Sequence, residues 1–164
     1  MDSTLTLADA AATERLARAI APHLAAGDLV GLSGGLGAGK STFARALIAA
    51  RLATLGRAED IPSPSYTLVQ TYDLGPEDHP LVLWHADLNR LAAPAEIAEL
   101  GLEDAFATAI TLVEWAERLG TALPARRLTL TLDLLPGAEN ARRARLSATG
   151  PGWDWLAAAI EAAA

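Results

Sequence analysis

Residues 34–41 are the stretch of this sequence whose types and spacing are most able to do chemistry. They read Gly-Gly-Leu-Gly-Ala-Gly-Lys-Ser and fit G-x-x-x-x-G-K-[ST], the phosphate-binding loop. Glycines let several backbone N–H groups approach one phosphate and reach positive φ without steric cost. Lys40 would place a point charge on the β- and γ-phosphates of a nucleotide, and the hydroxyl of Ser41 would be a ligand for Mg²⁺. The stretch therefore predicts a nucleotide-phosphate site.

The segments on either side are those that a phosphate-binding loop requires. Residues 29–33 are an apolar run typical of a short buried strand, and residues 42–55 are predicted to form a helix. The start of such a helix favours an anion through its unpaired N–H groups and its dipole. Lys40 is the only lysine beside twelve arginines, and the bulkier, forked arginine would not fit the same cradle. A Gly-rich turn that binds nothing is the alternative.

Two predicted strands end in an acidic residue. Residues 81–87 are an apolar run that ends at Asp87, in the form of a Walker B strand, and residues 110–114 have the same form with Glu114. In open α/β sheets, ligands bind at the carboxyl ends of the strands. One carboxylate could hold Mg²⁺ with Ser41 while the other positions an attacking water, and the residues alone leave open which does which. The alternative for either acid is a solvated strand end or a helix cap.

Residues 63–67 lie where a switch loop would be. The hydroxyls of this Ser-Pro-Ser-Tyr-Thr segment could approach a γ-phosphate, and an ordinary Ser/Pro turn is the alternative. Three histidines have no metal-ligand spacing and are interpreted as structural or exposed; they are His23, His79 and His85.

The remaining pattern predicts one α/β domain over residues 1–164, a three-layer fold like that of the P-loop NTPases with a mixed parallel and antiparallel central sheet. A first helix is expected over residues 6–26, with Thr6 or Asp9 as its cap and a bend at Pro22. Further helices are expected over residues 94–100, 102–107 and 152–164, and further strands over residues 63–72, 109–115, 127–134 and 143–149. Turns at residues 74–80 and 136–137 each predict an antiparallel strand pair.

The composition bounds the location and the partners. The chain has no cysteine, which excludes disulfides and thiolate metal sites and fits a reducing cytoplasm. Its first residues lack the features of a signal peptide, and no run approaches the roughly 18 apolar residues of a membrane span. The net charge of −7 disfavours tight unaided binding to a nucleic-acid backbone. We therefore expect a cytoplasmic protein with neither DNA nor a membrane as a partner.

Four blocks of this sequence resemble the TsaE family, also called YjeE. The blocks are residues 34–42, 63–69 (Ser-Pro-Ser-Tyr-Thr-Leu-Val), 85–91 (His-Ala-Asp-Leu-Asn-Arg-Leu) and 112–115 (Leu-Val-Glu-Trp). Their order and spacing and the chain length agree with the family. The resemblance implies a small ATPase of tRNA threonylcarbamoyladenosine synthesis that binds ATP and Mg²⁺ and turns over slowly alone. It also implies a TsaB–TsaD heterodimer as partner, which modifies adenosine 37 of tRNAs reading codons that begin with A.

The resemblance assigns roles to single residues. It implies that Lys40 cradles phosphate, that Ser41 and Glu114 hold Mg²⁺, and that Asp87 acts near the attacking water. It places the nucleotide against Thr13, Gly35, Leu36, Gly37, Ala38, Gly39, Thr42, Ser65, Thr67 and Trp115. The sequence departs from the family twice: Gly35 stands where the family often has an acid, and Asn89 replaces the tyrosine of Asp-Leu-Tyr-Arg.

Three other functions are compatible with the loop. A small-molecule kinase needs an acceptor pocket and usually an arginine-rich lid, for which only Arg142, Arg143 and Arg145 are candidates; a solvated strand face is their preferred interpretation. A guanine-nucleotide switch generally uses [NT]-K-x-D, which is absent because Lys40 is the only lysine. A module that holds nucleotide without turnover is disfavoured by the two strand-end acids.

Overall fold

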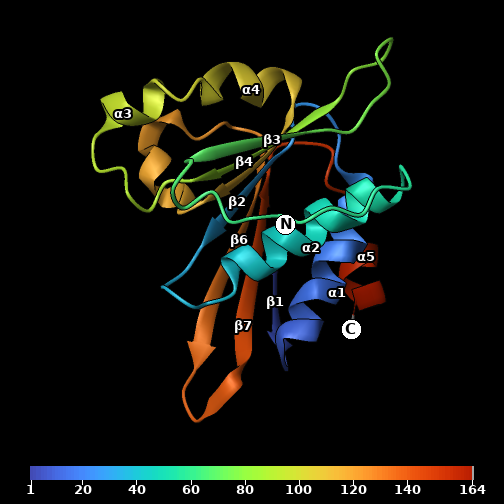
Figure 1. The fold of residues 1–164 in the computed structure, drawn as a ribbon. Helices are drawn as coiled ribbons and strands as arrows, with labels where there is room; N and C mark the ends of the chain where they lie inside the picture. Colours follow the sequence, from blue (N-terminus) through green and yellow to red (C-terminus); the bar gives the residue numbers. More distant parts are fainter. Residues whose placement is uncertain (164) are drawn as a thin grey trace.

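A seven-stranded mixed sheet forms the centre of the computed structural model, which describes residues 1–163 (Figure 1). The strands are β1 (Asp2–Leu7), β2 (Leu29–Ser33), β3 (Val69–Asp73), β4 (Val82–Asp87), β5 (Ile110–Glu114), β6 (Arg127–Leu135) and β7 (Ala138–Thr149). The α-helices are α1 (Ala10–Ile20), α2 (Lys40–Ala53), α3 (Pro94–Ala98), α4 (Leu102–Thr108) and α5 (Leu156–Ala163), and the 3₁₀ helices are η1 (Ala21–His23) and η2 (Ala116–Ala122).

The strand order is β1-β7-β6-β2-β5-β4-β3. The four central strands β6, β2, β5 and β4 are parallel, whereas β3 and the β7–β1 pair add antiparallel edges. Strands β2 and β5 are buried along almost their whole length because helices cover both faces of the sheet. This arrangement confirms the predicted mixed sheet.

Helices lie on both faces, which gives three layers. Figure 1 shows α1, α2 and α5 together on one side of the sheet and α3 and α4 on the other. Leu16, Phe43 and Leu47 belong to the core under α1 and α2, whereas Leu102 and Val113 belong to a separate core under α4. The predicted α/β fold of the P-loop type is therefore confirmed.

The bounds predicted for the first helix, residues 6–26, are wrong at both ends, whereas Asp9, one of the two predicted caps, is confirmed as its N-cap. Thr6 lies in β1, which pairs with β7, and α1 begins only after Asp9, whose side chain accepts a hydrogen bond of 2.8 Å from the backbone N–H of Ala12. The helix gives way to η1, which contains Pro22. The pairing of β1 joins segments about 140 residues apart, so no local pattern indicates it.

Other boundaries also differ, and β7 begins at Ala138 rather than at residue 143. The strand expected over residues 63–72 begins only at Val69, because Leu68 has φ +68° and its N–H donates to Pro64 O in a tight turn. The last helix begins at Leu156 rather than at residue 152. In the segment before it, the ring N–H of Trp153 donates a hydrogen bond to Thr149 O. Ala164, included in the predicted helix, lies outside the described residues.

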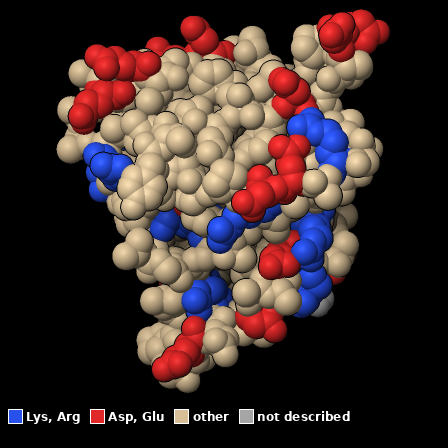
Figure 2. Space-filling model, viewed as in Figure 1, with Lys and Arg blue, Asp and Glu red and all other residues tan. Residues whose placement is uncertain are grey.

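The surface has mixed charge. On the face drawn in Figure 2, lysine and arginine side chains are interspersed with aspartate and glutamate. Within residues 1–163, the helices are too short or too polar to cross a bilayer.

Candidate functional site

The loop between β2 and α2 has the conformation that its glycines permit. Gly34, Gly37 and Gly39 have φ of +134°, +75° and +108°, a region that other residues rarely adopt. A Cβ on Gly34 would lie 2.2 Å from the carbonyl oxygen of Leu132 in β6, whereas a Cβ on Gly35 would have nothing within 4 Å. The first glycine is thus required by the packing of the loop on the sheet, and the position where the family often has an acid is open.

We expect Gly34→Ala to lower the free energy of unfolding by about 1–3 kcal/mol, since the new methyl group meets backbone and φ is strained. Gly35→Ala is the matched control in the same loop, with an expected change within about 0.5 kcal/mol. Urea denaturation of both variants tests this. Equal stability of the two would contradict the close packing of Gly34.

The ammonium group of Lys40 lies inside the loop. Its Nζ donates hydrogen bonds to Gly34 O at 2.6 Å and Gly35 O at 2.8 Å, and lies 4.1 Å from the ring centroid of Trp115. Burial lowers the pKa of Lys40, and the nearby carboxylates, with Glu114 foremost, partly oppose this shift. A cation with little water around it gains strongly from an anion that reaches it.

Ser41, in the first turn of α2, faces the end of β5. Its hydroxyl donates a 2.8 Å hydrogen bond to Oε2 of Glu114, which is 2% exposed. The two residues are 73 positions apart in the chain and meet because β2 and β5 are adjacent parallel strands. A hydroxyl oxygen and a carboxylate oxygen are the kinds of ligand that Mg²⁺ prefers.

Asp87 lies beside Glu114, since the two are directly paired residues of β4 and β5. Its Oδ2 accepts from the hydroxyl of Ser65 at 3.2 Å, and its Oδ1 accepts from the backbone N–H of Asn89 at 2.9 Å. Ser65 is bonded in turn to Ser63 at 2.8 Å. The predicted switch segment therefore contacts the second acid through a serine, whereas Thr67 is exposed and its predicted role stays a prediction.

These groups share one cavity of about 280 Å³ on the loop. Trp115 closes one side of it with φ +59°, an unusual value for an aromatic residue, held by the bond from its N–H to Leu32 O. The cavity is lined by Leu36, Gly37, Ala38, Gly39, Lys40, Ser41, Thr42, Arg45, Ser65, Asp87, Asn89, Glu114 and Trp115. Most of the predicted site residues are thus brought together.

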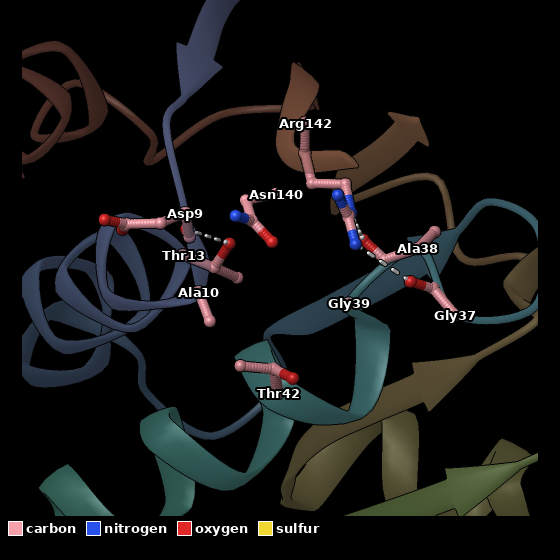
Figure 3. Close-up of a pocket in the computed structure, with 9 residues that line it drawn as sticks. All are labelled: Asp9, Ala10, Thr13, Gly37, Ala38, Gly39, Thr42, Asn140 and Arg142. Atoms are coloured by element: carbon pink, nitrogen blue, oxygen red, sulfur yellow. Dashed lines mark hydrogen bonds between the residues drawn. The ribbon is translucent and has the colours of Figure 1, made fainter. Parts of the chain in front are cut away.

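A second hollow of about 140 Å³ lies against the other side of residues 37–39 (Figure 3). It is lined by Asp9, Ala10 and Thr13 of the α1 end, Gly37, Ala38, Gly39 and Thr42 of the loop and α2, and Asn140 and Arg142 of β7. Thr13 therefore lies beside the loop despite its distance in sequence, and its predicted contact with nucleotide stays a prediction.

Arg142 has a role that the sequence did not indicate. Figure 3 shows its guanidinium directed at the loop, where it donates to Ala38 O at 3.1 Å and Gly37 O at 3.3 Å. Arg145 forms an ion pair with Asp133 on the same hairpin. These two guanidinium groups hold protein atoms, which weakens the case for a kinase lid made by this hairpin.

The contact of His85 with the site is the other feature that the sequence did not predict. The side chain is fully buried, and its Nε2 lies 2.8 Å from Oε1 of Glu114. Of the two interpretations given to His85, structural or exposed, the structure supports the structural one. Its position two residues before Asp87 in a strand, on the same face of the sheet, was the available signal.

The fold and the loop together define the class of this molecule. A buried parallel strand, a loop with left-handed glycines, and a helix that starts with Lys40 and Ser41 form a P-loop unit, with two acids at the ends of neighbouring strands. The molecule is an α/β protein of the P-loop class.

Comparisons with known proteins give the family. The family model described as "Threonylcarbamoyl adenosine biosynthesis protein TsaE" matches residues 7–144, and the chain belongs to the TsaE family. A protein of Rickettsia bellii named "tRNA threonylcarbamoyladenosine biosynthesis protein TsaE" is 38% identical over 123 residues, covering 75% of this chain and 81% of its own. The Bacillus subtilis protein of the same name is 30% identical over 145 residues, 88% of this chain and 84% of its own.

A solved structure agrees. The crystal structure of Bacillus subtilis YdiB superposes with a TM-score of 0.76 at 25% identity and covers 98% of this chain and 95% of its own. The similarity therefore extends over the whole sheet, including β1, which the sequence did not predict.

Proposed function

We propose that this chain is a Mg²⁺-dependent ATPase that supports formation of the threonylcarbamoyl group on adenosine 37 of tRNAs reading codons that begin with A. We propose that it acts with the TsaB–TsaD heterodimer and meets tRNA only through that complex, in the cytoplasm. The 2.8 Å bond between Ser41 of the loop and Glu114 at the end of β5 carries the ATPase proposal. The family and the names of the relatives support the place in tRNA modification.

The residues present fit ATP and Mg²⁺. Gly37 and Gly39, which carry no side chains, line the cavity, and so do the first residues of α2, so that the helix N-terminus faces it. Lys40 is the cation for the phosphates, while Ser41 and Glu114 are hard oxygen donors suited to Mg²⁺. Bound Mg²⁺ would neutralise phosphate charge during phosphoryl transfer.

Three side chains around the cavity would bind the phosphates, orient the attacking water and exclude solvent. Lys40 would exchange its bonds with the carbonyls of Gly34 and Gly35 for bonds with phosphate oxygens. Asp87, held by Ser65 and the N–H of Asn89, keeps carboxylate lone pairs free to orient a water and accept its proton. Trp115 would shield Lys40 from solvent and so strengthen its attraction for the phosphates.

We expect Asp87→Asn to lower ATP turnover by about 100-fold or more, since the amide is a poor proton acceptor for water. The affinity for ADP with Mg²⁺ is expected to change by less than about threefold, because Asp87 is not assigned to the cation. Steady-state hydrolysis and calorimetric ADP titration measure the two effects. Unchanged turnover would contradict the role of Asp87.

The test of the whole proposal is ATP hydrolysis by the purified chain, alone and then with TsaB–TsaD and substrate tRNA. We expect slow turnover alone, a rise with the pair, and repeated rounds of tRNA modification that stop when the chain is omitted. An ATP turnover rate that is the same with and without TsaB–TsaD and tRNA would overturn the assignment to tRNA modification. Phosphoryl transfer from ATP to a small metabolite would instead support the alternative function, a small-molecule kinase.

A further inference from the structure

The buried imidazole of His85 is a polar group near the cavity that the proposed chemistry has not used. Its side chain is 0% exposed, and the carboxylate of Glu114 is its hydrogen-bond partner at 2.8 Å. Among the buried side-chain nitrogen and oxygen atoms of residues 1–163, its Nδ1 is the one without a partner. The ring is therefore oriented by a single polar contact, the one with Glu114.

The sheet places His85 directly behind the two acids. In the parallel pair β4–β5, His85 is opposite Leu112 and Asp87 is opposite Glu114, so all four side chains point to the face covered by α2. His85 precedes Asp87 by two residues in β4, so it lies further from the carboxyl ends of the strands, and its side chain reaches diagonally across to Glu114 on β5. It contacts the carboxylate from the protein interior, whereas Ser41 contacts it from the cavity.

The two contacts use different oxygens of Glu114. Oε2 accepts from the hydroxyl of Ser41 and Oε1 lies against Nε2 of His85. A carboxylate only accepts hydrogen bonds, so the imidazole donates through Nε2–H, and in the neutral ring Nδ1 then has no hydrogen to donate. With Oε1 held from behind, the carboxylate can rotate little, and Oε2 stays directed at Ser41.

A residue that only filled this space would be apolar. Burying an imidazole with one unpaired nitrogen costs free energy that leucine or methionine would avoid, and buried polar groups of this kind call for a functional explanation. The donor to Glu114 supplies that explanation. Carboxylates that bind metals are themselves oriented by hydrogen bonds from groups behind them, and the loss of such a partner typically weakens metal binding.

We propose that His85 is a positioning residue, whose Nε2–H fixes the carboxylate of Glu114 so that Oε2, together with Ser41, is preorganised for Mg²⁺. This role rests on the proposed function, since it concerns the cation that accompanies the nucleotide. His85 itself contacts neither cation nor nucleotide in this assignment; it acts through Glu114.

The test compares His85→Gln with His85→Asn by calorimetric titration of ADP, in EDTA and over a series of Mg²⁺ concentrations. Glutamine can place an amide N–H near the position of Nε2, whereas asparagine has the same group but stops short of Glu114. We expect His85→Asn to raise the Mg²⁺ concentration for half-maximal enhancement of ADP binding by about 10-fold or more. His85→Gln is expected to stay within about threefold of the wild type, and both should bind ADP in EDTA as the wild type does.

Coupling to the carboxylate is tested in the Glu114→Gln background. There we expect His85→Asn to cause no further change in the Mg²⁺ dependence, because the group it positions has lost its charge. Thermal denaturation of every variant shows whether the fold is retained. If His85→Asn does not fold, His85→Leu takes its place, because leucine also lacks a donor to Glu114 and we expect from it the same Mg²⁺ response.

The outcomes separate the two proposals. If the wild-type chain binds ADP equally in EDTA and in Mg²⁺, the Mg²⁺ site itself fails. If Glu114→Gln loses the Mg²⁺ response while His85→Asn keeps it, only the role of His85 is overturned. Equal losses in His85→Asn and His85→Gln, in EDTA as well as in Mg²⁺, would reduce His85 to a packing residue.

Discussion

Lys40→Ala is expected to abolish measurable nucleotide binding, with a loss in ATP turnover of about 100-fold or more. The substitution removes the cation that would meet the phosphates and leaves Trp115 without its partner at 4.1 Å. Lys40→Arg keeps the charge, but its planar fork would clash where Nζ now lies between Gly34 O and Gly35 O, so we expect no rescue. Calorimetric titration with ADP and steady-state hydrolysis measure both variants.

The melting temperature separates this loss from unfolding. Burial lowers the pKa of Lys40. At neutral pH the charged ammonium group therefore lowers the free energy of unfolding, because it is less favourable in the folded chain than in the unfolded chain. The hydrogen bonds to Gly34 O and Gly35 O that the variant loses act in the opposite direction, so Lys40→Ala should melt close to the wild-type temperature. Arg145→Ala, which removes an exposed ion pair with Asp133, is the matched control and should leave nucleotide binding unchanged. Near-normal turnover in Lys40→Ala would refute the phosphate site.

Glu114→Gln is expected to remove most of the Mg²⁺ dependence of ADP binding and to lower turnover by about 100- to 1,000-fold. The amide keeps the size of the side chain but loses the charge that Mg²⁺ and the hydroxyl of Ser41 face. In EDTA we expect ADP to bind as tightly as to the wild type or more tightly, since a carboxylate that repels the phosphates is gone. Titrations of ADP with and without Mg²⁺ give both values.

Comparison with Asp87→Asn assigns the two acids. Asp87 and Glu114 are paired residues of adjacent strands, yet the hydroxyl of Ser41 bonds to Glu114 and that of Ser65 to Asp87. We therefore expect the Mg²⁺ response to fail in Glu114→Gln and to persist in Asp87→Asn. The reverse pattern would exchange their roles and would also remove the basis for a positioning role of His85.

Local sequence was sufficient for the parts of this protein that neighbouring residues decide. The loop at residues 34–41 is defined by glycines at fixed offsets, the hairpin of β6 and β7 by alternation around Pro136-Gly137, and the strand ends by apolar runs that stop at Asp87 and Glu114. Each of these signals depends on a few consecutive residues. For that reason the α/β class, the P-loop and the family could be predicted before any contact was known.

Contacts between distant segments were decided only by the tertiary structure. The pairing of β1 with β7, the bond from Arg142 to the loop carbonyls about 104 residues away, and the bond from His85 to Glu114 have no counterpart in local periodicity. The residues alone left open whether Glu114 or Asp87 is the partner of Ser41; the family resemblance favoured Glu114, and the structure shows that bond. The sequence by itself determined which groups lie at the ends of strands. The order and register of the strands decided which of those groups meet. The physical reason is that side chains far apart in the chain become neighbours only when the sheet is formed.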